Sequence, residues 1–239
     1  MNPMNDLAVI IPVGPKEDAW RALLPDLAFL PSAAEIIVVG TGSEPKAFAE
    51  VAGRFHKGQT IRWLASRKGR ARQLNFGVAA SKKKLLWFLH ADSRVEKEAI
   101  DALESSLMRF EEALHYFDLL FLDDGPGLTR INTVGVWIRS HWMGLPFGDQ
   151  GFCIPRHLFE KLGGFDGKAA YGEDHLLVWA AHRNGIPLRC TGAAIRTSAR
   201  RYGKRGWGRA TARNMILTAK QALPELAKLL GKRVAHAKP

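Results

Sequence analysis

Cysteine is nearly absent from this sequence, with two residues in 239, Cys153 and Cys190. Two cysteines are too few for the disulfide framework of a small secreted fold, and they lack the C-x-x-C spacing typical of zinc sites. No run of 18 or more apolar residues occurs, which argues against a membrane-spanning helix. The N-terminus shows no basic segment followed by an apolar stretch and a small-residue cleavage site, so we expect a cytoplasmic protein.

Acidic residues are scarce relative to basic ones, 23 against 35, which gives a net charge of +12. Such an excess suits phosphate-bearing ligands, an anionic membrane surface or nucleic acid. The bases come without the aromatic platform of an RNA-recognition motif and without zinc-finger spacing, so we rank phosphate-bearing ligands first, a membrane surface second and expect no nucleic acid. The apolar fraction of 46% is that of an ordinary globular protein.

The most informative stretch is Leu85–Arg94, which begins as a short, wholly apolar run and ends in His90-Ala91-Asp92. A short apolar run of this kind is typical of a strand buried on both faces of a parallel sheet. Ligands of open α/β sheets bind outside the carboxyl ends of the strands. A carboxylate at that position suits a hard divalent cation.

Apolar runs and helical patterns alternate along the chain. We predict strands over 7–13, 35–39, 61–65, 85–89, 116–122, 148–154, 188–190 and 194–197. We predict helices over 18–30, 44–55, 70–82, 96–110, 128–143, 156–162, 174–184 and from 200 onward. The β-α-β-α-β order at the start predicts a mostly parallel sheet with right-handed crossovers, flanked by helices.

Several local features carry finer expectations. Ser43 is a plausible N-cap for the second helix. Trp137 and Trp142 are expected to serve packing rather than to form a cofactor site, and Pro224 is expected to break the C-terminal helix. We expect one domain over residues 1–199, with residues 200–239 forming a basic helical extension that packs on or flanks it.

Four cations crowd the loop Arg67–Arg72, directly before a predicted helix. A helix N-terminus offers free backbone N–H groups and a positive dipole end, and guanidinium groups bind phosphate oxygens in pairs. Because this loop precedes the strand that ends in Asp92, it predicts a diphosphate site at the same edge of the sheet.

Four segments together resemble the inverting family 2 glycosyltransferases of the GT-A fold, in particular a small bacterial branch. The segments are Glu35–Ser43, Gly69–Gly77 with the strand to Ser93, Gly148–Gly151 with Leu162–Asp166, and Gly172-Glu173-Asp174. The resemblance covers roughly residues 7–197. It implies an α/β GT-A fold and transfer of a sugar from a nucleotide-sugar donor to an acceptor hydroxyl.

The resemblance also implies residue roles. The metal, Mn²⁺ or Mg²⁺, would lie at His90 and Asp92, the general base would be Asp174 of the Glu173-Asp174 pair, and donor-binding residues would be Arg70, Arg72, Gln73, Gly40, Thr41, Asp149, Gln150, Arg200 and Arg201. Two positions depart from the family pattern. His90 stands where the metal signature has an acid, and Gly40 stands where an acid usually contacts the nucleotide, which leaves the nucleotide open and a catalytically inactive scaffold conceivable.

Other interpretations remain open from the sequence. A nucleotidyltransferase shares a similar layout but would carry a glycine-rich basic loop after the first strand, and Ile11–Lys16 is a poor match. A non-catalytic domain that binds nucleic acid or a membrane surface explains the charge but gives the acids no role. The basic tail from Arg200 to Arg233 could rest at the inner face of a membrane and reach a lipid-linked acceptor, or its apolar residues could pack on the sheet domain.

Overall fold

The structure, a computed structural model, describes residues 2–55, 58–126, 128–200, 202 and 206–236. Its strands are β1 Leu7–Pro12, β2 Glu35–Gly40, β3 Thr60–Ala65, β4 Leu85–Phe88, β5 Ser93–Arg94, β6 Leu114–Phe121, β7 Cys153–Pro155 and β8 Leu188–Thr197. Its α-helices are α1 Trp20–Asp26, α2 Lys46–Ala52, α3 Arg70–Ala79, α4 Lys97–Arg109, α5 Thr129–His141, α6 Arg156–Lys161, α7 Glu173–Arg183 and α9 Trp207–His236. Short 3₁₀ turns, η1 Pro3–Asp6, η2 Leu27–Phe29 and η3 Gly148–Gln150, complete the order.

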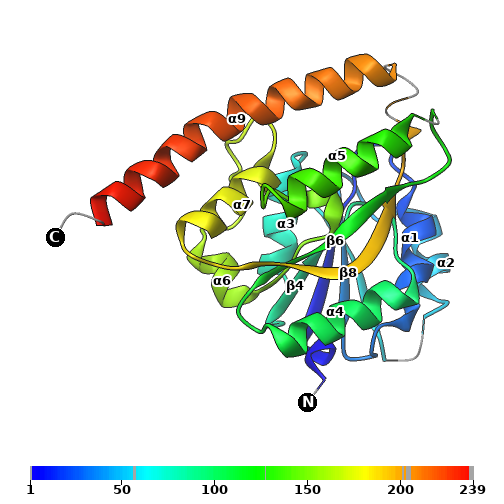
Figure 1. The fold of residues 1–239 in the computed structure, drawn as a ribbon. Coiled ribbons are helices and arrows are strands. Elements are labelled where there is room, and N and C mark those ends of the chain that lie inside the picture. Colours follow the sequence, from blue (N-terminus) through cyan, green and yellow to red (C-terminus); the bar gives the residue numbers. More distant parts are fainter. Residues whose placement is uncertain (1, 56–57, 127, 201, 203–205, 237–239) are drawn as a thin grey trace.

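All eight strands form one sheet in the order β3-β2-β1-β4-β7-β6-β8-β5. The pairs β1–β2, β2–β3, β1–β4 and β6–β8 are parallel, whereas β7 runs antiparallel to both β4 and β6. Figure 1 shows the sheet at the centre, with helices on both sides of it. The predicted mixed α/β fold with a mostly parallel central sheet is therefore confirmed.

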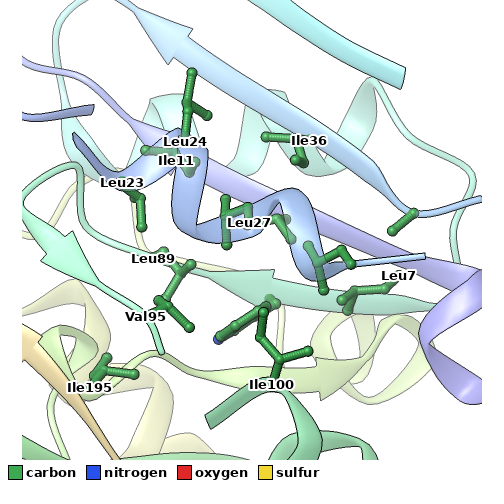
Figure 2. Packing of buried hydrophobic residues seen from close by; sticks show 14 of the residues in the cluster. Leu7, Ile11, Leu23, Leu24, Leu27, Ile36, Leu89, Val95, Ile100 and Ile195 are labelled. Carbon is green, nitrogen blue, oxygen red and sulfur yellow. The ribbon is translucent and has the colours of Figure 1, made fainter. Parts of the chain in front are cut away.

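Each face of the sheet carries its own apolar core. In β1 every residue is buried, and successive side chains alternate between the two cores, as the strand period of two requires. Figure 2 shows the core under α1, where Leu23, Leu24 and Leu27 pack near Ile11 and Ile36 of the sheet. The other core lies beneath α3, α6 and α7. Because both faces are covered, the central strands read as continuous apolar runs.

Some local predictions are wrong. The segment before β7 is a 3₁₀ turn rather than a strand, because Gly151 adopts a positive φ of 63° that ends the extension. Helix α2 begins after Pro45, which stands extended at the cap position with no side-chain cap, so Ser43 does not cap it. The strands predicted over 188–190 and 194–197 are one strand, β8, with an irregularity opposite Tyr116 and Asp118.

Two further predictions, one about α9 and one about α5, are also wrong. Helix α9 continues through Pro224, because hydrogen bonds from Gln221 and ion pairs of Glu225 fix it to the main domain on both sides of the proline. Trp142, expected to serve packing, is 77% exposed, while Trp137 is 43% exposed and stacks on the ring of His141. No helix in the described part of the chain is long and apolar enough to cross a bilayer.

Candidate active site

The first cavity of interest lies at the carboxyl ends of β1 and β4, where an open α/β sheet binds its ligands. Its volume is about 260 Å³, and it is lined by Pro12, Gly14, Pro15, Glu17, Lys68, Gly69, Arg70, Gln73, His90, Ala91 and Asp92. The basic loop before α3 and the end of β4 thus meet here, as the sequence predicted. Glu17 lies in a segment with no recognisable motif, so sequence reasoning missed it.

Arg70, the first residue of α3, joins three separate parts of the chain. Its Nε donates a short hydrogen bond to the Glu173 carboxylate, and its Nη2 lies 3.2 Å from Oδ1 of Asp174. Its Nη1 lies 3.1 Å from Nε2 of His90. A guanidinium can only donate, so this ring nitrogen of His90 is the acceptor. The predicted metal ligand His90 and the predicted base Asp174 therefore both contact the predicted phosphate ligand Arg70.

Asp174 is held as a carboxylate by its surroundings. The Gly148 N–H donates to Oδ2 of Asp174 at 2.6 Å, and a side chain at Gly148 would clash, since its Cβ would stand 2.7 Å from that oxygen. Burial opposes ionisation, but the charge of Arg70 and the Gly148 hydrogen bond outweigh it and lower the pKa of Asp174. Burial alone would lower the pKa of Arg70, but the negative charges of Asp174 and Glu173 outweigh burial and raise this pKa. Both partners therefore stay charged at neutral pH.

Asp149 is in the opposite situation. Its Oδ1 atom is buried without a hydrogen-bond partner within the described residues. Burial raises the pKa of Asp149, the charge of Arg139 lowers it, and nearby Asp174 and Asp92 raise it again. Asp149 thus has a buried, unsatisfied oxygen within electrostatic range of Asp92, and a cation bound nearby would offset the cost of burying its charge.

Two glutamines predicted to contact the donor have their amide groups committed to the fold. Nε2 of Gln73 donates to Val13 O at 2.8 Å and to Val39 O at 2.6 Å, which ties together the ends of β1 and β2. Nε2 of Gln150 donates to Phe117 O at 2.9 Å, and its Oε1 accepts from Arg139 at 3.2 Å. Their clearest role in this structure is to shape the site.

The end of β2 is closed by an indole ring. A Cβ atom on Gly40 would lie 2.0 Å from the Trp63 ring, and Trp63 Nε1 donates to Gly42 O at 3.0 Å. An acid at this position would require Trp63 to move. Neither Gly40 nor Thr41 lines the cavity described above. The departure from the family pattern at Gly40 is therefore coupled to the position of Trp63.

A second cavity, of about 530 Å³, adjoins the first. It is lined by Lys68, Gly69, Arg70, Ala71, Arg72, Gly167, Ala169, Ala170, Tyr171, Gly172 and Glu173. Both cavities share Lys68, Gly69 and Arg70, whereas Arg72 lines only the second. Arg70 therefore lies between the two spaces, whereas Arg72, predicted to serve the same ligand, lines only the second one.

The predicted C-terminal arginine pair is only partly described. Arg200 lies 3.6 Å from Glu17, which lines the first cavity, and 3.9 Å from Asp124. Arg201 lies outside the described residues. Arg200 thus reaches the rim of the cavity through an acid rather than entering it.

One group of three potential metal ligands is found among the described residues, away from this cavity. Asp118, His141 and Cys190 place their ligand atoms within 4.8 Å of one another, and His141 Nε2 lies 2.8 Å from Asp118 Oδ1. The predicted metal residues His90 and Asp92 are not part of it. In the candidate site, a cation would rely on carboxylates together with oxygens of a bound diphosphate, the usual arrangement for Mg²⁺.

Comparison with known families agrees with the resemblance found in the sequence. A family model described as Glycosyl transferase family 2 matches residues 9–125, which include most of β1, all of β2 to β4 and the loop to Asp92. No curated protein matches the sequence.

Solved structures with the same fold include S. aureus TarS and a mannosyltransferase. S. aureus TarS 1-349 in complex with UDP-GlcNAc has 16% identity and a TM-score of 0.61, over 80% of this chain and 58% of that one. The mannosyltransferase PcManGT from Pyrobaculum calidifontis, in complex with GDP-Man and Mn²⁺, has 16% identity and a TM-score of 0.65, over 95% of this chain and 68% of that one. The chain spans less than two thirds of the TarS chains. At 16% identity, the likeness to these structures concerns the fold alone.

Proposed function

We propose that this chain, which belongs to glycosyltransferase family 2, transfers a sugar from a nucleoside-diphosphate sugar to an acceptor hydroxyl with inversion. The observation that carries the proposal is the contact of Arg70 with Glu173, Asp174 and His90 at the carboxyl edge of the sheet. Arg70, the residue proposed to bind phosphate, and Asp174, the candidate base, thus share one site at the boundary of the two cavities.

The donor would occupy the cavity at β1 and β4, where Lys68 and Arg70 offer positive charge to its diphosphate. UDP-GlcNAc and GDP-Man in the related structures support a nucleotide-sugar donor without choosing between uridine and guanosine. The acceptor would enter from the second cavity, beside Glu173.

In the proposed reaction, Asp174 takes the proton of the acceptor hydroxyl as that oxygen attacks the anomeric carbon. The bond from this carbon to the diphosphate oxygen breaks, and the nucleoside diphosphate leaves. Asp174 is ionised but weakened as a base, because Arg70 and Gly148 stabilise its charge. A diphosphate that draws the Arg70 guanidinium away would raise the pKa of Asp174, so donor binding would prepare the base.

A divalent cation, Mn²⁺ or Mg²⁺, fits Asp92 and the unsatisfied oxygen of Asp149, and it would neutralise charge on the leaving diphosphate. His90 is a weaker candidate, because its Nε2 already accepts from Arg70 in this structure. The proposal extends to an acceptor that is lipid-linked and held at the cytoplasmic face of a membrane, for which the basic tail is the motivation.

The proposal is tested by thermal unfolding with UDP, GDP, CDP and dTDP, each with and without Mn²⁺. A nucleotide at a hundredfold excess over its Kd should add about 2.7 kcal/mol to the free energy of unfolding. Asp92→Asn should remove the Mn²⁺-dependent part. If no nucleotide shifts the transition, the donor assignment fails. If nucleotides act equally with and without Mn²⁺, the cation assignment fails while the donor site stands.

A further inference from the structure

Helix α5 carries its apolar side outward. Its exposed face holds Ile131, Val134, Ile138 and Trp142 at the cap, with exposed fractions of 57%, 59%, 39% and 77%. These positions recur every three or four residues and so share one helix face. Large apolar side chains gathered on one exposed face normally mark an interaction surface.

The inner side of α5 is held by polar contacts, which explains why the helix does not turn over. Ser140 O accepts from the hydroxyl of Tyr116 at 3.2 Å, and Arg139 donates to Gln150. His141 Nε2 contacts Asp118 in β6. Rotating the apolar face inward would break all three contacts, of which the Tyr116 hydrogen bond is buried and therefore costly to lose.

Helix α9 adds a second amphipathic surface on the same side of the molecule. Its N-terminal part touches α5 through Asn132 and Thr211, and Figure 1 shows both helices opposite α4. Four large apolar side chains of α9 are exposed, namely Met215, Ile216, Leu223 and Leu226. On a helical projection they form a stripe, bordered by the exposed bases Arg209, Arg213 and Lys220.

The charge on these segments is positive throughout. Residues 128–148 contain no acid, and residues 200–239 contain one, Glu225, which is 5% exposed and paired with Arg183. We propose that the outward face of α5 and the apolar stripe of α9, together the α5–α9 face, dock on an anionic lipid bilayer. Apolar side chains would enter the headgroup boundary while the bases meet anionic lipid, and tryptophan suits that depth.

Charge argues against a second copy as the occupant. A two-fold dimer through this face would place the same surface of each copy against the other, so the bases of α9 would face bases. Residues 128–148 and 200–239 offer no exposed acid to balance them, because their single acid, Glu225, is buried and paired with Arg183. The inference goes beyond the proposed sugar transfer, because it concerns a surface whose lipid binding can be measured without any turnover.

The experiment is flotation of the full chain with vesicles of neutral lipid alone or with added anionic lipid, at low and high salt. We expect binding to anionic vesicles that weakens at high salt. Val134→Ser with Ile138→Ser should reduce the partition coefficient by roughly tenfold or more, and Arg209→Glu with Arg213→Glu should do the same. The matched control is Met108→Ser in α4, an equally exposed apolar residue at 58%, which should bind as the wild type does.

A readout on folded protein guards against misfolded variants. Lipid-borne quenchers should reduce the fluorescence of wild type more than that of Trp142→Phe, because Trp142 would lie within the bilayer boundary. Failure of the wild type to float with anionic vesicles at low salt overturns the proposal. So does undiminished binding by the α5 double variant, or a dimer in solution that the same variant dissociates.

Discussion

Two regions of this molecule depart from ordinary burial in opposite directions. At the carboxyl edge of the sheet, charged groups are buried, with Glu173 and Asp174 only 7% and 8% exposed. On α5, large apolar groups are exposed. Helix α4 is the reference for both. It has the same length as α5, 13 residues, but it buries Ile100, Leu103 and Leu107 against the sheet. A buried charge and an exposed apolar face both cost stability in isolation, so each suggests a role beyond folding.

The two departures are stabilised by different means. The buried acids are paired within the fold, through Arg70 and the Gly148 N–H. No segment in the described part of the chain covers the exposed apolar face of α5. Glu173 and Asp174 are thus paired in the isolated protein, and a ligand can change that pairing. The exposed face of α5 needs an outside surface before its apolar area leaves water.

The largest effect is expected at the charged edge. Asp174→Asn keeps an oxygen for the Gly148 N–H but removes the charge and the basicity, so sugar transfer should fall by about a hundredfold or more. Nucleoside-diphosphate binding should persist, because Lys68 and Arg70 remain. Transfer, or slow donor hydrolysis, is measured beside nucleotide affinity.

Glu173→Gln is the matched control for this change, since it neutralises the neighbouring acid and leaves Asp174 in place. If Asp174→Asn turns over within a few-fold of wild type, the Glu173-Asp174 pair only stabilises the start of α7. The charged edge would then have no catalytic role to set against the exposed face of α5. A loss confined to Glu173→Gln would move the base to Glu173.

A smaller effect is expected in the reference helix. Ile100 is 3% exposed and packs in the core seen in Figure 2, so Ile100→Ala should lower the free energy of unfolding by about 2–5 kcal/mol. Chemical denaturation with an unchanged m-value would measure it. A loss below about 1 kcal/mol would mean that α4 is not the well-packed reference that the comparison requires.

The sequence was sufficient for the fold because the deciding signals are local. The apolar run of β4, its end at Asp92 and the basic loop before α3 lie within about 30 residues, and each predicts its place on the sheet edge. Pairing across the chain could not be predicted in this way. Arg70 and Glu173 are 103 positions apart, and no local pattern indicates that they meet.

The orientation of α5 was equally inaccessible. Its spacing predicts an amphipathic helix, and the usual rule turns the apolar side inward, which misplaced Trp142. Hydrogen-bond partners on β6 and η3 decide which side of α5 faces inward. These partners come close to α5 only in the folded chain. Gln73 shows the same limit, because its type suits a ligand contact whereas its surroundings engage it with backbone carbonyls.

The smallest effect is the most informative about the exposed face. Ile131→Ala repeats the Ile100 substitution in the first turn of α5, where the side chain is 57% exposed. Little apolar contact is lost and alanine favours the helix, so the free energy of unfolding should change by less than about 0.5 kcal/mol. The same denaturation series measures both variants. With anionic vesicles present, however, Ile131→Ala should bind more weakly than wild type, while Met108→Ala should not. A loss of stability near that of Ile100→Ala would show that α5 is packed in solution, by a second copy or by a rearranged α9, and the contrast between the two helices would disappear.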